Sequence, residues 1–276
     1  EIEGEQMDVT LQHVEFSYEP ERKVLRDISL TIPSGKFVSL VGLSGCGKST
    51  IAALLTGKNR TFSGQIQINN VPIQEIKESS LMNKITLVRH NSYLFKGTVE
   101  ENLKMADPSV SREQMEAALR QVNLYEFLQM QNGLDTMLEE QGSNFSGGQR
   151  QRAWIAMALA QKTGILFLDE PTTYLDISHQ LEILQLLREL NVQQGVTVVM
   201  VLHDLNHAIM FSDYLVTIKD GKKYLEGSPE EVVTPHMLQE VFDVEAEVIQ
   251  HPVLHVPVCL PYGVRGQTFA KDMKEV

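Results

Sequence analysis

Residues 42–50 are the part of the sequence whose types and spacing point most directly to chemistry, since they read GLSGCGKST. They fit the pattern G-x-x-x-x-G-K-[ST], in which consecutive backbone N–H groups surround a polyphosphate. Lys48 is expected to reach the β- and γ-phosphates, and Ser49 to complete the shell of a Mg²⁺ ion. The sequence therefore predicts a site for ATP or GTP at Gly42, Ser44, Gly45, Cys46, Gly47, Lys48, Ser49 and Thr50.

Two acids follow the apolar run 165–168, which reads ILFL. Asp169 and Glu170 would then lie at the carboxyl end of a buried strand, where open α/β sheets bind their ligands. Asp169 suits coordination of Mg²⁺, and Glu170 suits polarisation of an attacking water. A pair of ordinary surface acids is the alternative, which the four apolar residues directly before them disfavour.

A short polar turn at Ser146, Gly147, Gly148 and Gln149 leads into a helical stretch. Free N–H groups at a helix N-terminus can bind an anion, but the same turn is an ordinary helix cap, and on its own it favours neither role. Tyr18 precedes the phosphate loop and could stack on a nucleotide base, although a lone strand tyrosine is more often a plain sheet residue.

The elements that must position these residues alternate between strands and helices. Apolar runs at 37–41, before the phosphate loop, and at 196–202, before His203, predict buried strands. The other predictions are strands at about 9–18, 28–32 and 85–88, hairpins at 64–73 and 214–225, a helical section at about 90–160, a helix at 178–190, and helix starts at Ser228 and Thr234. No element is predicted after Gln250.

The composition bounds the kind of protein. With 276 residues, 42% of them hydrophobic, the chain can form one large domain or two small ones. Its formal charge of −12 differs from the basic balance of many nucleic-acid binders, so no nucleic acid is expected as a partner. No apolar run approaches the roughly 18 residues of a membrane span, and there is no signal peptide or cysteine framework. We expect an intracellular soluble protein which, beginning at Glu1, is an excised or processed piece.

In this order, the motifs resemble those of the nucleotide-binding domain of an ATP-binding cassette (ABC) transporter, from about residue 7 to 248. The matching motifs are the phosphate loop 42–50, the signature 146–149, the Walker B strand 165–170, the D-loop 174–176 and the switch histidine His203. The resemblance implies an α/β P-loop NTPase fold with a RecA-like core, an antiparallel β-subdomain and a helical subdomain insertion. We expect one domain over 1–276, with its core at 1–88 and 161–233, helical insertion at 89–160, and C-terminal helix and tail at 234–276.

The same resemblance implies an ATPase that drives membrane transport. Tyr18 would stack on adenine, Ser49 and Asp169 would hold Mg²⁺, Glu170 would orient water, and His203 would contact the γ-phosphate. Two such domains, identical or different, would pair head to tail, so that one domain's phosphate loop and the other's turn 146–149 enclose each ATP.

Further implications concern the partners of the domain. Asp176 would link the two ATP sites across the dimer interface. Transmembrane subunits or domains would convert closure and opening of the dimer into transport. The chain would therefore work at the cytoplasmic face of the cell membrane.

The sequence departs from the family pattern at two positions. The glutamine of the family's Q-loop, which touches Mg²⁺ and signals to the membrane subunit, aligns with His90, so that metal contact is in question there. Phe145 stands where leucine usually precedes the signature, an apolar exchange with little expected effect.

The resemblance also divides along the chain. Residues up to about 145, especially 91–103, resemble the ATPase domain of an ABC exporter, whereas residues from about 153 resemble ATPases of iron-siderophore importers. We hypothesise a mosaic, natural or engineered, that joins the two between Ser146 and Arg152. The direction of transport and the cargo stay open.

Other functions are less well supported. A non-transport ABC ATPase of DNA repair, chromosome structure or translation would be expected to carry coiled coils, paired cassettes or basic extensions, and a regulator without hydrolysis would not need both Glu170 and His203. Two metal sites are weak alternatives. His203 and His207 have the i,i+4 spacing of a ligand pair, but no third ligand is apparent and the switch-histidine role accounts for His203. Prolines interrupt His251, His255 and Cys259, which excludes a helical ligand face there.

Overall fold

A six-stranded sheet forms the centre of the computed structural model, which describes residues 7–89, 93–161 and 163–266. Its strand order is β12-β11-β3-β10-β9-β6, and all strands are parallel except β12. The strands β3, β9 and β10 are buried along their whole length, as expected for parallel strands covered on both faces. The bounds are β3 Phe37–Val41, β6 Ile85–Arg89, β9 Ile165–Asp169, β10 Thr197–Val201, β11 Tyr214–Lys219 and β12 Lys222–Gly227.

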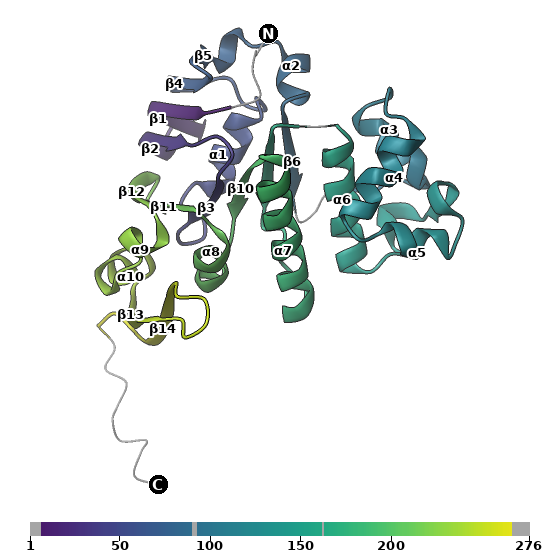
Figure 1. Ribbon diagram of the computed structural model, residues 1–276. Coiled ribbons are helices and arrows are strands. Elements are labelled where there is room, and N and C mark those ends of the chain that lie inside the picture. The colour runs from purple at the N-terminus through teal and green to yellow at the C-terminus, as the bar shows by residue number, and fades with distance from the viewer. Residues whose placement is uncertain (1–6, 90–92, 162, 267–276) are drawn as a thin grey trace.

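An antiparallel sheet of order β2-β1-β4-β5 lies beside this core (Figure 1). It comprises β1 Val9–Glu19, β2 Arg22–Ile32, β4 Ser63–Ile68 and β5 Val71–Pro72. Helix α1, Lys48–Leu55, is buried at every residue except Ser49, and its apolar side chains share one cluster with residues of both sheets. The phosphate-loop helix is therefore enclosed between the two sheets and has little freedom to tilt.

The helical section lies to one side of the core sheet, with α6 nearest to the sheet (Figure 1). It contains α3 Val99–Ala106, α4 Arg112–Gln121, α5 Tyr125–Gln129 and α6 Gly147–Ala160. Helix α6 packs against α3 and α4 and also against β6 and α7, so it joins this section to the core. Phe145, just before α6, is buried with its ring centroid 5.6 Å from that of Phe127, so the larger side chain is accommodated.

The remaining helices cover the sheet or flank it. They are α7 Ile177–Gln194, α8 Leu205–Phe211, α9 Pro229–Val232 and α10 Pro235–Phe242, with a short α2 at Glu78–Met82. Short strands β7 Gly97–Thr98 and β8 Met137–Leu138 pair with each other, and single 3-10 turns lie at Ile73–Glu75, Gly133–Asp135 and Glu140–Gly142. In the part of the chain that the structure describes, no helix is both long enough and apolar enough to traverse a bilayer.

A partly buried ion pair fastens α7 to the first residue of β3. Arg188 Nη2 donates to Asp213 Oδ1 at 2.7 Å, and the other carboxylate oxygen accepts from the backbone N–H of Phe37 at 2.9 Å. Burial alone would raise the pKa of Asp213, but the hydrogen bonds from Arg188 and Phe37 outweigh it and hold this pKa below its ordinary value. The pair fixes the start of the strand that leads into the phosphate loop.

These elements confirm the expected α/β fold, and almost every predicted strand and helix is present. One element was not predicted, a hairpin of β13 Val244–Gln250 and β14 Pro257–Val264. Pro257 and Pro261 argued against a strand in the sequence, because proline has no N–H to donate to a neighbouring strand and is confined to strand starts, edges and bulges. Asn206 of α8 fastens the hairpin, since its side chain donates to Cys259 O at 3.1 Å and accepts from Cys259 N at 2.8 Å.

We predict that Asn206→Ala frees this hairpin without unfolding the core. Loss of two hydrogen bonds should lower the free energy of local opening by about 1–3 kcal/mol, because each contributes roughly 0.5–1.5 kcal/mol. Amide hydrogen exchange over residues 257–264 should accelerate, whereas exchange in β3 and β9 should not. The exposed-amide variant Gln74→Ala is the control, and equal exchange over 257–264 in both variants would contradict the assignment.

Candidate functional site

The phosphate loop lies between β3 and α1, and its backbone needs glycine at two points. Gly42 has φ +150°, and a Cβ there would lie 2.2 Å from the carbonyl oxygen of Ile218. Gly47 has φ +109°, and its Cβ would lie 2.6 Å from Leu25 Cδ2. The backbone of β11 therefore excludes a side chain at Gly42, and the positive φ of Gly47 makes any other residue there strained.

Lys48 is only 5% exposed and points back into the loop. Its Nζ donates to Gly42 O at 2.8 Å and to Leu43 O at 2.9 Å, and Cys46 Sγ lies 3.7 Å away. A buried ammonium requires such partners. The positive charge is thus held at the centre of a loop rich in N–H groups, where an anion can replace the carbonyl contacts.

Ser49 and Asp169 meet although they come from different elements. Ser49 Oγ, in the first turn of α1, donates to Asp169 Oδ1, at the end of β9, over 3.0 Å. Asp169 is only 7% exposed. A hydroxyl and a carboxylate at this separation form an oxygen donor set that fits a hard cation such as Mg²⁺. Thr50, the last residue of the loop, is buried, and its Oγ1 lies 3.4 Å from the Tyr18 hydroxyl.

Glu170 and His203 form the opposite wall of the same cavity. His203 Nε2 lies 2.6 Å from Glu170 Oε1, while the backbone N–H of Glu170 donates to Val201 O at 3.1 Å. Glu170 adopts a positive φ of 56°, which a non-glycine residue rarely does and which directs its side chain towards the cavity. The cavity has a volume of about 260 Å³ and is lined by Val24, Ser44, Gly45, Gly47, Lys48, Ser49, Thr50, Glu170 and His203.

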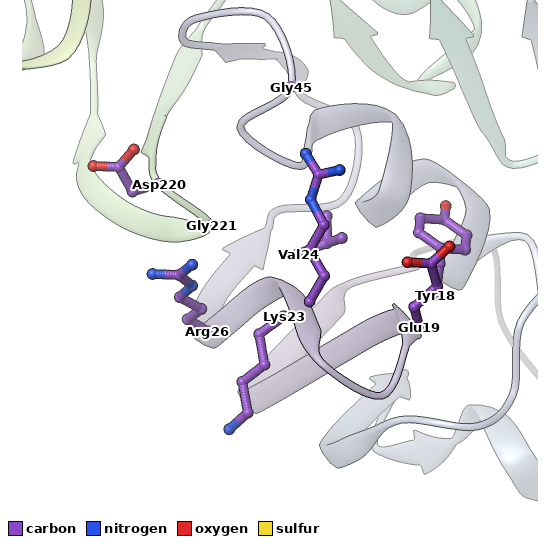
Figure 2. Close-up of a pocket in the computed structure, with 9 residues that line it drawn as sticks. Tyr18, Glu19, Lys23, Val24, Arg26, Gly45, Asp220 and Gly221 are labelled. Atoms are coloured by element: carbon purple, nitrogen blue, oxygen red, sulfur yellow. The ribbon is translucent and has the colours of Figure 1, made fainter.

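A second cavity adjoins the first, because Val24 and Gly45 line both. Its volume is about 460 Å³, and Figure 2 shows Tyr18 on one side and the turn at Asp220 and Gly221 on the other. Tyr18 is 61% exposed, and its ring meets that of Phe16 edge to face with centroids 4.8 Å apart, so a face is available for stacking. The complete lining is Tyr18, Glu19, Arg22, Lys23, Val24, Arg26, Gly45, Asp220 and Gly221.

Apart from Tyr18 and Gly45, the residues that line this second cavity were not predicted as site residues from the sequence. Arg22, Lys23 and Arg26 lie on β2, and three basic residues within five positions were a usable signal for an anionic ligand. The hairpin turn at Asp220 and Gly221 was predicted as a turn, but its approach to the site depends on the close packing of Gly221, whose Cβ would lie 2.2 Å from Val24 O.

The turn 146–149 does not reach the phosphate cavity of its own chain. Among the described residues that line the two cavities, none belongs to this turn. Ser146 Oγ accepts from the N–H of Gln149 at 3.2 Å, and Gln149 Oε1 accepts from the N–H of Ser146 at 2.8 Å, which makes a capping box for α6. The helix N-terminus that Gly147 and Gly148 open is thus left facing outside its own nucleotide site.

Asp176 caps helix α7. Its Oδ1 accepts from His179 N at 3.0 Å and from Ser178 Oγ at 2.9 Å. The hydrogen bond from the His179 backbone, followed by those from the His179 and Ser178 side chains, lowers the pKa of Asp176 from its ordinary 3.8 to about 2. The carboxylate is therefore ionised at neutral pH, although it lies on the surface.

The remaining sequence candidates are the Q-loop position and the residues considered as metal ligands. His90 lies outside the described residues. His207 is buried at 8% exposure beside Asp204, and His203 is engaged by Glu170. Across residues 7–89, 93–161 and 163–266, no three or more His, Cys, Asp or Glu side chains form a group that could hold a metal ion.

Comparison with known proteins gives a consistent picture. A family described as ABC transporter matches residues 25–173. The chain is 39% identical over 249 residues to an iron(3+)-hydroxamate import ATP-binding protein of Bacillus subtilis, covering 88% of this chain and 91% of that protein. It is 35% identical to a ferric enterobactin transport ATP-binding protein of Escherichia coli, covering 87% of this chain and 89% of that protein.

Exporters also match. An ATP-dependent lipid A-core flippase of Vibrio vulnificus is 39% identical over 235 residues, which span 84% of this chain and 40% of that protein. The solved structure of a bacterial Atm1-family ABC exporter with ATP bound superposes with a TM-score of 0.76 at 30% identity, over 85% of this chain and 40% of that chain.

We predict that Tyr18→Ala weakens nucleotide binding while the fold stays intact. Stacking of an aromatic ring on a base contributes about 1–3 kcal/mol, so Kd should rise about 5- to 150-fold. Titration with a fluorescent adenine nucleotide measures it. Tyr262→Ala is a matched control, because Tyr262 has the same 61% exposure but lies on β14. Equal Kd values for both variants would contradict a base-stacking role.

Proposed function

This chain belongs to the ABC transporter family, and from that premise we propose how its residues divide the work of binding and hydrolysing ATP. It is the ATP-binding, ATP-hydrolysing subunit or domain of a transporter. One observation carries the proposal for the site. Lys48, Ser49, Glu170 and His203 line one cavity, whereas no residue of the turn 146–149 is among the described residues that line it. A chain built this way supplies one half of each of two composite sites.

Nucleotide binding would use both cavities. The adenine would stack on Tyr18 in the larger one, and the phosphates would extend past Gly45 into the smaller one, where Lys48 exchanges its carbonyl contacts for phosphate oxygens. Ser49 and Asp169 would hold Mg²⁺, which neutralises charge on the phosphates when it is bound. The 3.0 Å contact between these two residues supports that pairing.

Hydrolysis would be promoted by Glu170. The carboxylate accepts a proton from water as the water oxygen bonds to the γ-phosphorus and the bond from that phosphorus to the ADP oxygen breaks. His203, 2.6 Å from Glu170 in this structure, holds the carboxylate over the cavity and is placed to donate to a γ-phosphate oxygen instead. The products are ADP and inorganic phosphate.

ATPases of this family dimerise and work with transmembrane subunits. We propose that the second ATPase domain, identical or different, places its turn 146–149 over the γ-phosphate held by Lys48, as two head-to-tail copies would require. Free N–H groups at the start of α6 and its positive dipole end support this role. The working location would be the cytoplasmic face of the cell membrane.

Iron-siderophore import is the direction that the comparisons support best. The hydroxamate import protein aligns over 88% of this chain and 91% of its own length. The flippase reaches the same 39% identity over 84% of this chain, and this observation favours export as the second candidate. The hypothesis of a mosaic joined between Ser146 and Arg152 would account for both. It predicts that residues up to 145 and residues from 153, compared separately, rank different subfamilies first, and one shared subfamily would refute it.

The experiment that tests the function is Mg²⁺-dependent ATP hydrolysis by the purified chain. We predict turnover in the wild type and a loss of kcat of about 100-fold or more in Glu170→Gln, since a positioned general base typically contributes at least that factor. Nucleotide affinity should be retained, because the amide preserves size and the phosphate loop is unchanged. The exposed strand acid Glu247, replaced in Glu247→Gln, is the matched control.

Different results would separate the parts of this proposal. Absence of ATP binding in the wild type contradicts the nucleotide site itself. Equal turnover in Glu170→Gln and wild type removes Glu170 from the chemistry. A His90→Gln variant measured alongside tests the Q-loop position, and recovery of activity by this change in an inactive wild type would show that His90 has uncoupled the site.

A further inference from the structure

The turn 146–149 packs directly against the N-terminal end of α7. A Cβ on Gly148 would lie 3.2 Å from His179 Cδ2 and 3.8 Å from His179 Cγ, and a Cβ on Gly147 would lie 3.1 Å from Leu175 Cδ2. The two glycines therefore contact one residue before Asp176 in the sequence, Leu175, and one residue after it, His179. Even a methyl group at Gly148 would require the imidazole to shift by a few tenths of an ångström, so the glycine and the ring occupy adjoining space.

The other edge of the same imidazole holds Asp176. His179 Nδ1 lies 2.8 Å from both carboxylate oxygens of Asp176. Because the carboxylate is ionised and can only accept, Nδ1 must carry the proton and donate. Cδ2 and Nδ1 lie on opposite sides of the ring, so one rigid, planar group touches the turn 146–149 with one edge and the D-loop aspartate with the other.

From Asp176 the contacts continue towards Glu170. Gln180, one residue after His179, donates to the carbonyl oxygens of Thr172 at 3.2 Å and Leu175 at 3.0 Å. The intervening Thr173 Oγ1 lies 3.5 Å from Glu170 Oε2. The first turn of α7 thus fixes the segment between the catalytic acid and the D-loop at both ends.

We propose that His179 is a positioning residue that couples the two ATP sites, by linking the turn that contacts the partner's nucleotide to the Asp176 loop and so to Glu170 of its own site. The inference rests on the proposed function, in which the turn 146–149 and Glu170 serve different nucleotides. Displacement of the turn by the partner's γ-phosphate pushes on the imidazole, and the imidazole carries Asp176 with it. Neither contact requires His179 to touch ATP.

A pair of variants separates the hydrogen bond from the bulk of the ring. His179→Leu keeps an apolar side chain against Gly148 but cannot donate to Asp176, whereas the side-chain amide nitrogen of His179→Gln can donate to the Asp176 carboxylate. We expect His179→Leu to lower kcat by about 2- to 30-fold, the range for coupling residues of 0.5–2 kcal/mol, with KM little changed. His179→Gln should restore most of the loss.

Controls exclude a merely structural effect. His236→Ala removes an exposed histidine from the first turn of another helix, α10, and should leave kcat unchanged. Melting temperatures of the His179 and His236 variants should agree. Trp154, the single tryptophan of the chain, lines a cavity of about 110 Å³ together with Gly147 and Leu175. Its emission on addition of ATP, in a Glu170→Gln background, should change in the parent and His179→Gln but not in His179→Leu.

A double-mutant cycle tests the contact itself. Gly148→Ala places a methyl group where it meets the ring and should impair turnover by shifting His179, whereas His179→Ala opens space for that methyl group. The double variant is therefore expected to be no worse than His179→Ala alone. Losses that multiply would show that the two positions act independently and would overturn the inference.

The outcomes distinguish this inference from the proposed function. A wild-type chain that hydrolyses ATP, with His179→Leu indistinguishable from His236→Ala in kcat and in Trp154 emission, overturns the coupling role and leaves the ATPase assignment standing. A wild-type chain that neither binds nor hydrolyses ATP overturns the proposed function and this inference with it.

Discussion

A hydrogen bond of 3.0 Å between Ser49 Oγ and Asp169 Oδ1 joins the first turn of α1 to the end of β9, and the two residues are 120 positions apart in the chain. It exists because β3, β10 and β9 are parallel and in fixed register, with Val201 opposite Leu40 on one side and Asp169 on the other. The phosphate loop, Glu170 and His203 follow these positions within one or two residues. Since the three strands are buried on both faces, a slip of one residue would displace a chemical group and move apolar side chains from their packing. The strand register that packs the core therefore also fixes the geometry of the site.

The same register accounts for the proposal that a single chain holds half a site. Every group that the parallel strands position lies at one edge of the sheet, around the phosphate cavity. The turn 146–149 belongs instead to the start of α6, which packs against α3 and α4 as well as β6 and α7, and none of its residues is among the described residues that line the cavity. In the proposed dimer, two copies related by a twofold axis would give each cavity a turn from the other copy, which is the self-complementary arrangement expected of a closed dimer. A link such as the one proposed for His179 would then be useful, because each chain would serve two nucleotides.

Local sequence signals predicted most of the fold and of the site. The runs 37–41 and 165–168 are mainly apolar and are followed by a glycine-rich loop and by two acids, so strand, loop and chemistry could be inferred together. The hairpin at Val244–Gln250 and Pro257–Val264 was missed because its ladder includes two prolines and depends on Asn206, which lies 53 residues before its partner Cys259 in the chain. The contact between Gly148 and His179 depends on how α6 meets α7, which no pattern within either helix specifies.

The central claim is that ATP is hydrolysed at a site shared by two chains, and complementation of two inactive copies tests it most directly. A Lys48→Ala copy lacks the phosphate-loop cation. A Ser146→Asp copy keeps a good helix cap but presents a carboxylate to the partner's γ-phosphate. Mixed in equal amounts, they form dimers with one site built from an intact loop and an intact turn. The account predicts that each copy alone is inactive and that the mixture regains Mg²⁺-dependent ATPase activity. A mixture as inactive as its components would contradict the shared site.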